Sequence, residues 1–228
     1  KIDILVTPLV TIGSGVAVSA LLAPTLGALA MKVGDLIMLA TNLQPFWMGI
    51  AVSVLVGVAL TLPISSAAIC AAFGLTGLAG GAAVAGCCAQ MVGFAVMSFR
   101  ENKWGGLVSQ GIGTSMLQMG NIIKNPRIWI APIVTSAITG PLATCLFKLQ
   151  MNGTPVSSGM GTCGLVGQIG VYTGWMNDIE AGTKSAVTAI DWIGLILISF
   201  VLPAVLCPLI NMVVRKLGWV KDGDMTLS

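Results

Sequence analysis

Residues 61–83 read TLPISSAAICAAFGLTGLAGGAA, and they lie within a run, residues 36–99, of 64 residues without Asp, Glu, Lys or Arg. A helix that crosses the ~30 Å hydrocarbon core of a bilayer needs about 20 predominantly apolar residues. The run is too long for one such helix and suits two. We therefore expect membrane spans near residues 48–72 and 80–99, separated by the glycine-rich sequence FGLTGLAGG and preceded by a polar turn at residues 41–45.

The composition of the whole chain supports a membrane environment. Of 228 residues, 56% are hydrophobic and 8% are charged, and the mean hydropathy is +0.96. Soluble domains carry about 25% charged residues, so we expect most of this surface to face lipid. The net charge of +3 comes from dispersed basic residues, which excludes nucleic-acid binding.

Histidine is absent, which excludes His-based acid–base catalysis, Ser–His and Cys–His nucleophiles and most zinc sites. The six cysteines lie in uncharged stretches without a C-x-x-C pair, and we interpret them as small apolar packing residues. We therefore expect no catalytic residue, no metal and no cofactor, and no enzymatic activity of the chain by itself.

Three further uncharged stretches are long enough to span the membrane, near residues 4–31, 128–147 and 192–214. Two others, residues 104–123 and 149–177, are rich in Gly, Ser and Thr. Irregular backbone at membrane depth requires surrounding protein or water, so we interpret these two as re-entrant or interfacial hairpins, with surface loops as the alternative. The predicted fold is a single all-α polytopic membrane domain, 1–228, with about five transmembrane helices and two hairpins.

The distribution of Lys and Arg predicts the orientation, because cytoplasmic loops carry an excess of both. With five crossings, three basic residues fall on one side: Lys1, Lys148 and Lys184. Eight fall on the other side: Lys32, Arg100, Lys103, Lys124, Arg127, Arg215, Lys216 and Lys221. This asymmetry predicts a cytoplasmic C-terminus and an external Lys1.

The hairpin at residues 149–177 contains the sequence SSGMGTCGLVGQIG, residues 157–170. It formally matches the G-x-G-x-x-G fingerprint, but no strand precedes it, which argues against a nucleotide-binding fold. Its glycines recur every third residue from 161 to 170, a spacing that suits backbone approach to a ligand or packing against another helix. Broken membrane helices bind polar solutes in transporters, so Thr162, Gly164 and Gln168 are candidate binding residues.

Other candidate solute-binding residues lie at breaks in the predicted spans and beside the same hairpin. Pro63 frees a backbone carbonyl, and nearby hydroxyl groups either repair this kink or line a polar path. The two carboxylates after the hairpin are either loop charges or groups that bind solute hydroxyls or a coupling proton. These further candidates are Asn42, Gln44, Ser65, Ser66, Asp178 and Glu180.

Three segments together resemble the EIIC-like membrane proteins of the bacterial phosphotransferase system, in the branch named after a perfringolysin O regulator. They are residues 61–83, 125–150 (NPRIWIAPIVTSAITGPLATCLFKLQ) and 159–170 (GMGTCGLVGQIG). The resemblance implies a homodimeric, multi-pass protein of the bacterial cytoplasmic membrane. Its ligand would be a small polar solute such as a sugar, and its partners would be IIA and IIB proteins. Family members are longer, so we expect an N-terminal membrane part to be missing here.

Two functions of different classes follow from these observations. The first is an EIIC-type translocator that binds and transports the solute, which the hairpin and the polar kinks favour. The second is a membrane-embedded sensor or regulator that binds the solute without moving it. EIIC domains of the glucose type use a His and a Gly-Ile-Thr-Glu segment, and neither occurs in this sequence. Their absence favours the second function. A membrane enzyme is a distant third, because no nucleophile with a base and an orienting group can be assembled.

Overall fold

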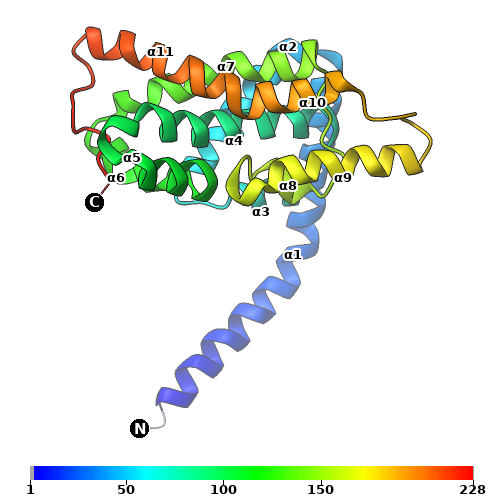
Figure 1. Cartoon of the computed structure of the whole chain (residues 1–228). Helices are drawn as coiled ribbons and strands as arrows, with labels where there is room; N and C mark the ends of the chain where they lie inside the picture. The colour runs from blue at the N-terminus through cyan, green and yellow to red at the C-terminus, as the bar shows by residue number, and fades with distance from the viewer. Residues whose placement is uncertain (1–2, 228) are drawn as a thin grey trace.

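A computed structural model describes residues 3–227, and the regular elements within this range are all helices (Figure 1). Four helical stretches in this range are long and apolar enough to cross a membrane: Ala23–Leu43, Gly77–Met97, Pro126–Leu146 and Ala189–Lys216. The chain is therefore an all-α polytopic membrane protein.

Helix α4 (Gly77–Met97) lies at the centre of the bundle, and 94% of its most apolar window is buried inside the protein. Helices α2 (Pro45–Thr61), α7 (Ile130–Pro141) and α11 (Leu202–Lys216) pack around it. The small residues of α4 allow backbones to touch. A Cβ atom added to Gly86 would lie 1.8 Å from the carbonyl oxygen of Ser53 on α2.

The long spans alternate in direction and define two ends of the bundle. Helix α4 begins at Gly77, which forms an isolated backbone bridge with Met151, and we call this end the bridge end. The 3-10 turn η3 (Pro126–Trp129), α7 and the π-helical turn η4 (Leu142–Leu146) run toward it. Helix α10 (Ala189–Ile196), the π-helical turn η6 (Leu197–Val201) and α11 run away from it.

The first part of the chain differs from the predicted spans at 4–31 and 48–72. Helix α1 (Asp3–Leu43) is continuous through two prolines and extends away from the body (Figure 1). Helix α2 ends at the predicted Pro63 break, because the residue before a proline avoids the helical region and Leu62 is extended, with ψ 155°. Helix α3 (Ser66–Phe73) then returns toward Gly77 instead of completing a second crossing.

Both predicted hairpins are pairs of broken helices that return to the end where they began. The first contains α5 (Phe99–Val108), η1 (Ser109–Gly113), η2 (Ser115–Gln118) and α6 (Met119–Lys124). It reverses at Thr114, whose backbone is extended. The second contains α8 (Pro155–Ser158), η5 (Cys163–Leu165) and α9 (Val166–Glu180), and it begins and ends at the bridge end.

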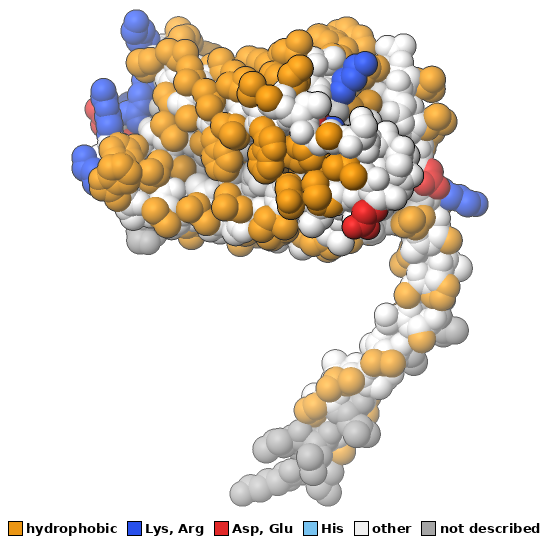
Figure 2. All heavy atoms as spheres, turned by 45° about the vertical axis from the view of Figure 1, so that its right-hand side comes forward, with side chains coloured by type: hydrophobic (Ala, Val, Ile, Leu, Met, Phe, Trp, Pro, Cys, Tyr) orange, Lys and Arg blue, Asp and Glu red, His pale blue; other side chains and the backbone are white. Residues whose placement is uncertain are grey.

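Basic side chains gather at the end of the bundle opposite the bridge end, and apolar side chains cover most of the face seen in Figure 2. We call this the basic end; it carries Arg100, Lys103, Lys124, Arg127, Arg215, Lys216 and Lys221. The placement of Lys32 on this side is wrong, because the neighbouring Met31 packs against Gly74 near the bridge end. Lys1 lies outside the described residues.

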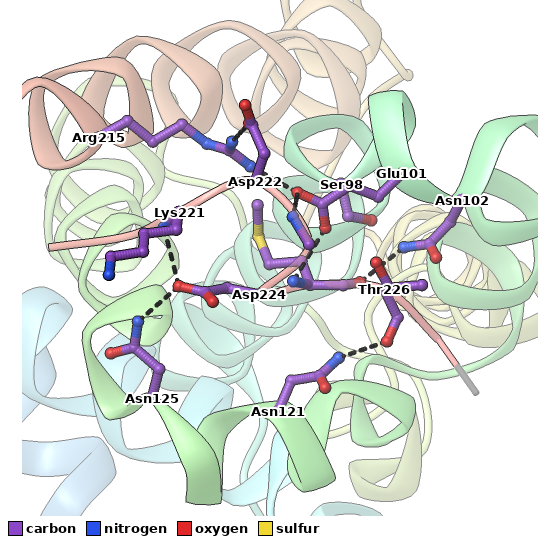
Figure 3. Close-up of polar contacts among 12 residues, drawn as sticks. Ser98, Glu101, Asn102, Asn121, Asn125, Arg215, Lys221, Asp222, Asp224 and Thr226 are labelled. Atoms are coloured by element: carbon purple, nitrogen blue, oxygen red, sulfur yellow. Dashed lines mark hydrogen bonds and ion pairs between the residues drawn. The ribbon is translucent and has the colours of Figure 1, made fainter. Parts of the chain in front are cut away.

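The C-terminal segment, residues 217–227, packs across the first hairpin at the basic end (Figure 3). The amide groups of Asn102 and Gln118, from the two limbs of the hairpin, both donate to the carbonyl oxygen of Met225, at 2.8 and 3.0 Å. Glu101 accepts hydrogen bonds from the backbone N–H groups of Gly223 and Met225 at 3.2 and 2.9 Å. The Met225 side chain is fully buried, so this segment is an integral part of the fold.

The close packing of α4 predicts that Gly86→Ala will lower the stability of the protein. The new methyl group would collide with the Ser53 carbonyl, and overpacking of this kind costs about 1–3 kcal/mol. Gly120→Ala is the matched control, because Gly120 is also helical and has nothing within 4 Å of an added Cβ. Thermal unfolding in detergent should show a lower Tm for the first variant only, and equal shifts would contradict this account.

The C-terminal contacts predict that Glu101→Ala will destabilise the protein by about 2–3 kcal/mol, a range typical of lost hydrogen bonds to a charged group. Glu101 also pairs with Arg215 at 2.8 Å, and its side chain is only 9% exposed. Asp222 pairs with the same arginine but is 93% exposed, so Asp222→Ala should cost less than about 1 kcal/mol. The ranking can be measured by chemical unfolding, and a larger loss in Asp222→Ala would refute it.

Candidate functional site

Three turns of the chain meet on the middle of α4, between Cys87 and Met91. They are the α2–α3 turn at residues 61–66, the tip of the first hairpin at 111–115, and the tip of the second hairpin at 159–165. The two hairpins arrive from opposite ends of the bundle. We call this region the convergence site.

Hydroxyl groups join the second hairpin to the other two turns. The Thr162 hydroxyl, which is fully buried, donates to the carbonyl oxygen of Gly111 at the tip of the first hairpin, at 2.5 Å. The Ser66 hydroxyl, at the start of α3, donates to the carbonyl oxygen of Gly159 at 2.7 Å. The structure thus shows Thr162 and Ser66, which the sequence predicts as solute contacts, bonded within the protein and holding the turns together.

A buried amide connects the first hairpin to the core of the bundle. The Thr61 hydroxyl lies 2.9 Å from the Ser115 hydroxyl and 3.3 Å from Oε1 of Gln90 on α4. The same oxygen accepts from the Trp129 indole N–H at 2.8 Å, and the Gln90 amide nitrogen donates to the Ser136 hydroxyl at 3.4 Å. Gln90 is fully buried, so five elements, α2, η2, η3, α4 and α7, share one polar network in an apolar setting.

Most of the glycines in the second hairpin serve close packing. A Cβ atom on Gly161 would lie 2.6 Å from Cβ of Cys87, and Gly161 also has a left-handed backbone, φ +54°. Added Cβ atoms on Gly167 and Gly170 would lie 2.5 Å from the Gly161 carbonyl and 2.3 Å from Cβ of Ser157. Gly164, with φ +52°, is exposed, and an added Cβ would make only an ordinary contact with Val166, at 3.8 Å. The three-residue spacing of these glycines was compatible with ligand approach or with close packing. Close packing applies at Gly161, Gly167 and Gly170.

Gln168 lies one turn beyond these tips and faces α4. Its amide nitrogen donates to Sγ of Cys88 at 3.2 Å. Ser199, in the π-helical turn η6, lies beside the same thiol and is fully buried. Within residues 3–227, neither Oε1 of Gln168 nor the Ser199 hydroxyl has a hydrogen-bond partner. Buried polar atoms without partners are costly, which keeps Gln168 as a candidate contact for a polar group, whereas the Ser199 hydroxyl has the Cys88 thiol beside it.

A cavity of about 460 Å³ lies at the bridge end, at the base of the second hairpin. Asp178 lines it, and its two carboxylate oxygens accept from the Asn152 amide nitrogen at 2.8 and 3.1 Å; the same nitrogen also donates to Oε1 of Gln150 at 3.2 Å. Lys184 pairs with Asp191 at 2.8 Å and lies over the Trp175 ring, 5.8 Å from its centroid. The other lining residues are Phe147, Lys148, Leu149, Gln150 and Thr183. Two carboxylates and two amines make this a polar cavity without excess charge.

Within residues 3–227, the remaining predicted residues form no side-chain bond between the turns, and they do not line the cavity. Asn42 and Gln44 are exposed at the junction of α1 and α2, and Glu180 is exposed at the end of α9. Ser65 is the N-cap of α3 and accepts from the backbone N–H of Ala68 at 3.1 Å. The nine predicted residues are therefore divided between the convergence site, the cavity and the surface.

Three residues of the buried polar network, Gln90, Ser115 and Trp129, were not predicted from the sequence. Gln90 could have been found, because it is the only amide side chain within the apolar sequence of α4. Ser115 and Trp129 carry no comparable signal, since nothing local shows that they lie beside α2 and α4. Thr61 lies in the segment where the sequence predicts a kink, but its hydrogen-bond partners, Gln90 and Ser115, come from other elements.

Apolar spans packed around helices that turn inside the bundle define a polytopic membrane protein. The sequence matches the family described as Phosphotransferase system, EIIC, over residues 1–227, and the chain belongs to this family. The match identifies the family and not the regulator branch within it. Comparison with curated proteins and with solved structures gave no match.

Proposed function

We propose that the chain is an EIIC-type membrane component that binds a small polar solute such as a sugar and carries it across the membrane. The observation that carries this proposal is the meeting of two hairpins from opposite ends at one polar region on α4. A solute held between two such tips is reachable from one side or the other as either tip moves. Broken helices at mid-depth are the elements that bind solutes in membrane transporters.

One face of α9 supports a route from the cavity at the bridge end to the convergence site. Gln168, Val171, Trp175 and Asp178 recur at helical spacing, so they lie on the same side of the helix. Asp178 and Trp175 line the cavity, and Gln168 contacts Cys88 of α4. Gln168 and Asp178 are ten residues apart on α9, which corresponds to about 15 Å along the helix axis. A sugar would first contact the carboxylate and the ring, and then the hydroxyls at the tips.

The orientation, the membrane and the partners are part of the same proposal. Cytoplasmic segments carry an excess of Lys and Arg, so the basic end faces the cytoplasm of a bacterial inner membrane and the cavity opens outward. The basic end is then the side on which IIA and IIB proteins would act. Helix α1 supports a homodimer, because only 11% of its Ala23–Leu43 window is buried in one chain.

Uptake by proteoliposomes tests this function. Purified protein should accumulate at least one labelled sugar, and a phosphoryl donor system with IIA and IIB proteins should increase the amount retained. Binding of a sugar without uptake under both conditions would identify a sensor or regulator, the alternative function. Neither binding nor uptake across a broad panel of sugars would contradict the proposal.

At the convergence site, Thr162→Val should reduce solute affinity by about tenfold, the effect of losing one buried hydrogen bond. The variant keeps the shape of the side chain and removes the hydroxyl that reaches Gly111. Thr173→Val is the control, because the exposed Thr173 hydroxyl bonds only to its own helix, at Ile169 and Gly170. Equilibrium binding to the identified sugar measures both variants, and equal affinities would place the site elsewhere.

At the cavity, Asp178→Asn should raise the KM for uptake by about tenfold, because a charge-assisted hydrogen bond to the solute becomes a neutral one. Glu180→Gln removes a carboxylate two residues away that is exposed and does not line the cavity. It should leave KM unchanged. If the two variants behave alike, the Asp178 carboxylate is only a surface charge.

A further inference from the structure

A second cavity, of about 220 Å³, lies between α4 and α11 at the basic end. Its apolar wall is formed by Val96, Pro208 and Met212, and its polar side by Arg100, Asn211 and Arg215. The two candidate spans that border it end close by, at Met97 and Lys216. The cavity therefore lies where hydrocarbon gives way to head groups.

Asn211 provides the first sign that this cavity binds a ligand. The residue is only 4% exposed, and its Oδ1 atom has no hydrogen-bond partner in the part of the chain that the structure describes. A carboxamide offers both donors and an acceptor. Because an unpaired polar atom at such a depth is costly, a polar group entering the cavity would be stabilised there.

The charges around the cavity favour an anion. Arg100 is exposed and forms no ion pair within residues 3–227, so its full charge is available. Arg215 is shared with Glu101 at 2.8 Å and with Asp222. A guanidinium group can donate two parallel hydrogen bonds to phosphate oxygens, and Arg100 is free to do so.

The surface leading away from the cavity is apolar. Val205, Leu209 and Met212 follow one side of α11, and they are 50%, 49% and 51% exposed. Free phosphate would gain nothing from such an apolar surface, whereas an acyl chain would bury it away from water. Basic pockets between membrane helices on the cytoplasmic side bind the head groups of anionic lipids.

We propose that this cavity binds the phosphate group of an anionic phospholipid, with Arg100 and Asn211 as its contacts and an acyl chain along Val205, Leu209 and Met212. The site is separate from the cavity at the bridge end, because the two cavities share no lining residue.

Native mass spectrometry of the purified full chain in detergent tests this proposal, with phosphatidylglycerol and phosphatidylcholine as probes. The wild type should bind phosphatidylglycerol at least about fivefold more tightly, as expected for about 1 kcal/mol from one basic residue near the head groups. Arg100→Gln should remove most of this preference, and so should Asn211→Ala. Lys103→Gln is the matched control, since Lys103 is an exposed basic residue of the same end that does not line the cavity.

Arg100 is exposed, so its variant should fold even if Asn211→Ala does not. Equal binding of the two lipids by the wild type would overturn the proposal, and so would equal losses in Arg100→Gln and Lys103→Gln. Displacement of phosphatidylglycerol by an equal concentration of inorganic phosphate would show a free-anion site instead. A change in dimerisation in Arg100→Gln, without any lipid preference in the wild type, would show that a second copy covers the cavity.

Discussion

The structure depends on the need to satisfy backbone polar groups where water is absent. Turns inside the bundle leave carbonyl oxygens that helices would otherwise bond, and here hydroxyl groups from other elements supply the donors. Such bonds run from Ser66 to Gly159, from Ser158 to Leu75 and from Thr162 to Gly111, at 2.5–2.7 Å. The small residues of α4 make these contacts possible, because bulkier side chains would hold the turns apart.

Links made of single hydroxyl–carbonyl bonds also determine which parts of the bundle can separate most easily. A hydroxyl–carbonyl bond contributes about 1 kcal/mol net, so each link at the convergence site is weak alone. The Thr162 link between the two hairpin tips is one such bond. The first hairpin is fixed more firmly at its base, where the carbonyl of Met225 holds both limbs and Glu101 holds the C-terminal segment. Separation of the tips is therefore the less costly motion, and it is the one that the proposed function needs.

The sequence predicted the class of fold and the breaks, because these are local properties. Uncharged length predicted apolar spans, Pro63 marked a kink inside the predicted span 48–72 where α2 ends, and glycine-rich segments predicted the hairpins. It did not predict that α3 returns to the bridge end, since a proline shows that a helix is interrupted but not where the chain goes next. The partners of Thr61 and Thr162 lie 54 and 51 residues away, and no local pattern specifies contacts at that separation. Asp178 was recognised as a notable charge, but its cavity needs Asn152 and Trp175 to be brought beside it.

The two ends of the bundle differ in the balance of their charged side chains, so the molecule is asymmetric along the bundle axis. The cavity at the bridge end balances two carboxylates with two amines, which suits a neutral polar solute. The basic end carries seven cationic side chains against Glu101, Asp222 and Asp224. Hydrogen bonds from the Lys221 backbone N–H and the Asn125 amide lower the pKa of Asp224, so this carboxylate stays charged at neutral pH and part of the basic field is used to hold the C-terminal segment. Arg100 is exposed and lies outside that network. A charge-balanced cavity at one end and a cationic surface at the other therefore arise from one bundle whose core contains almost no charge.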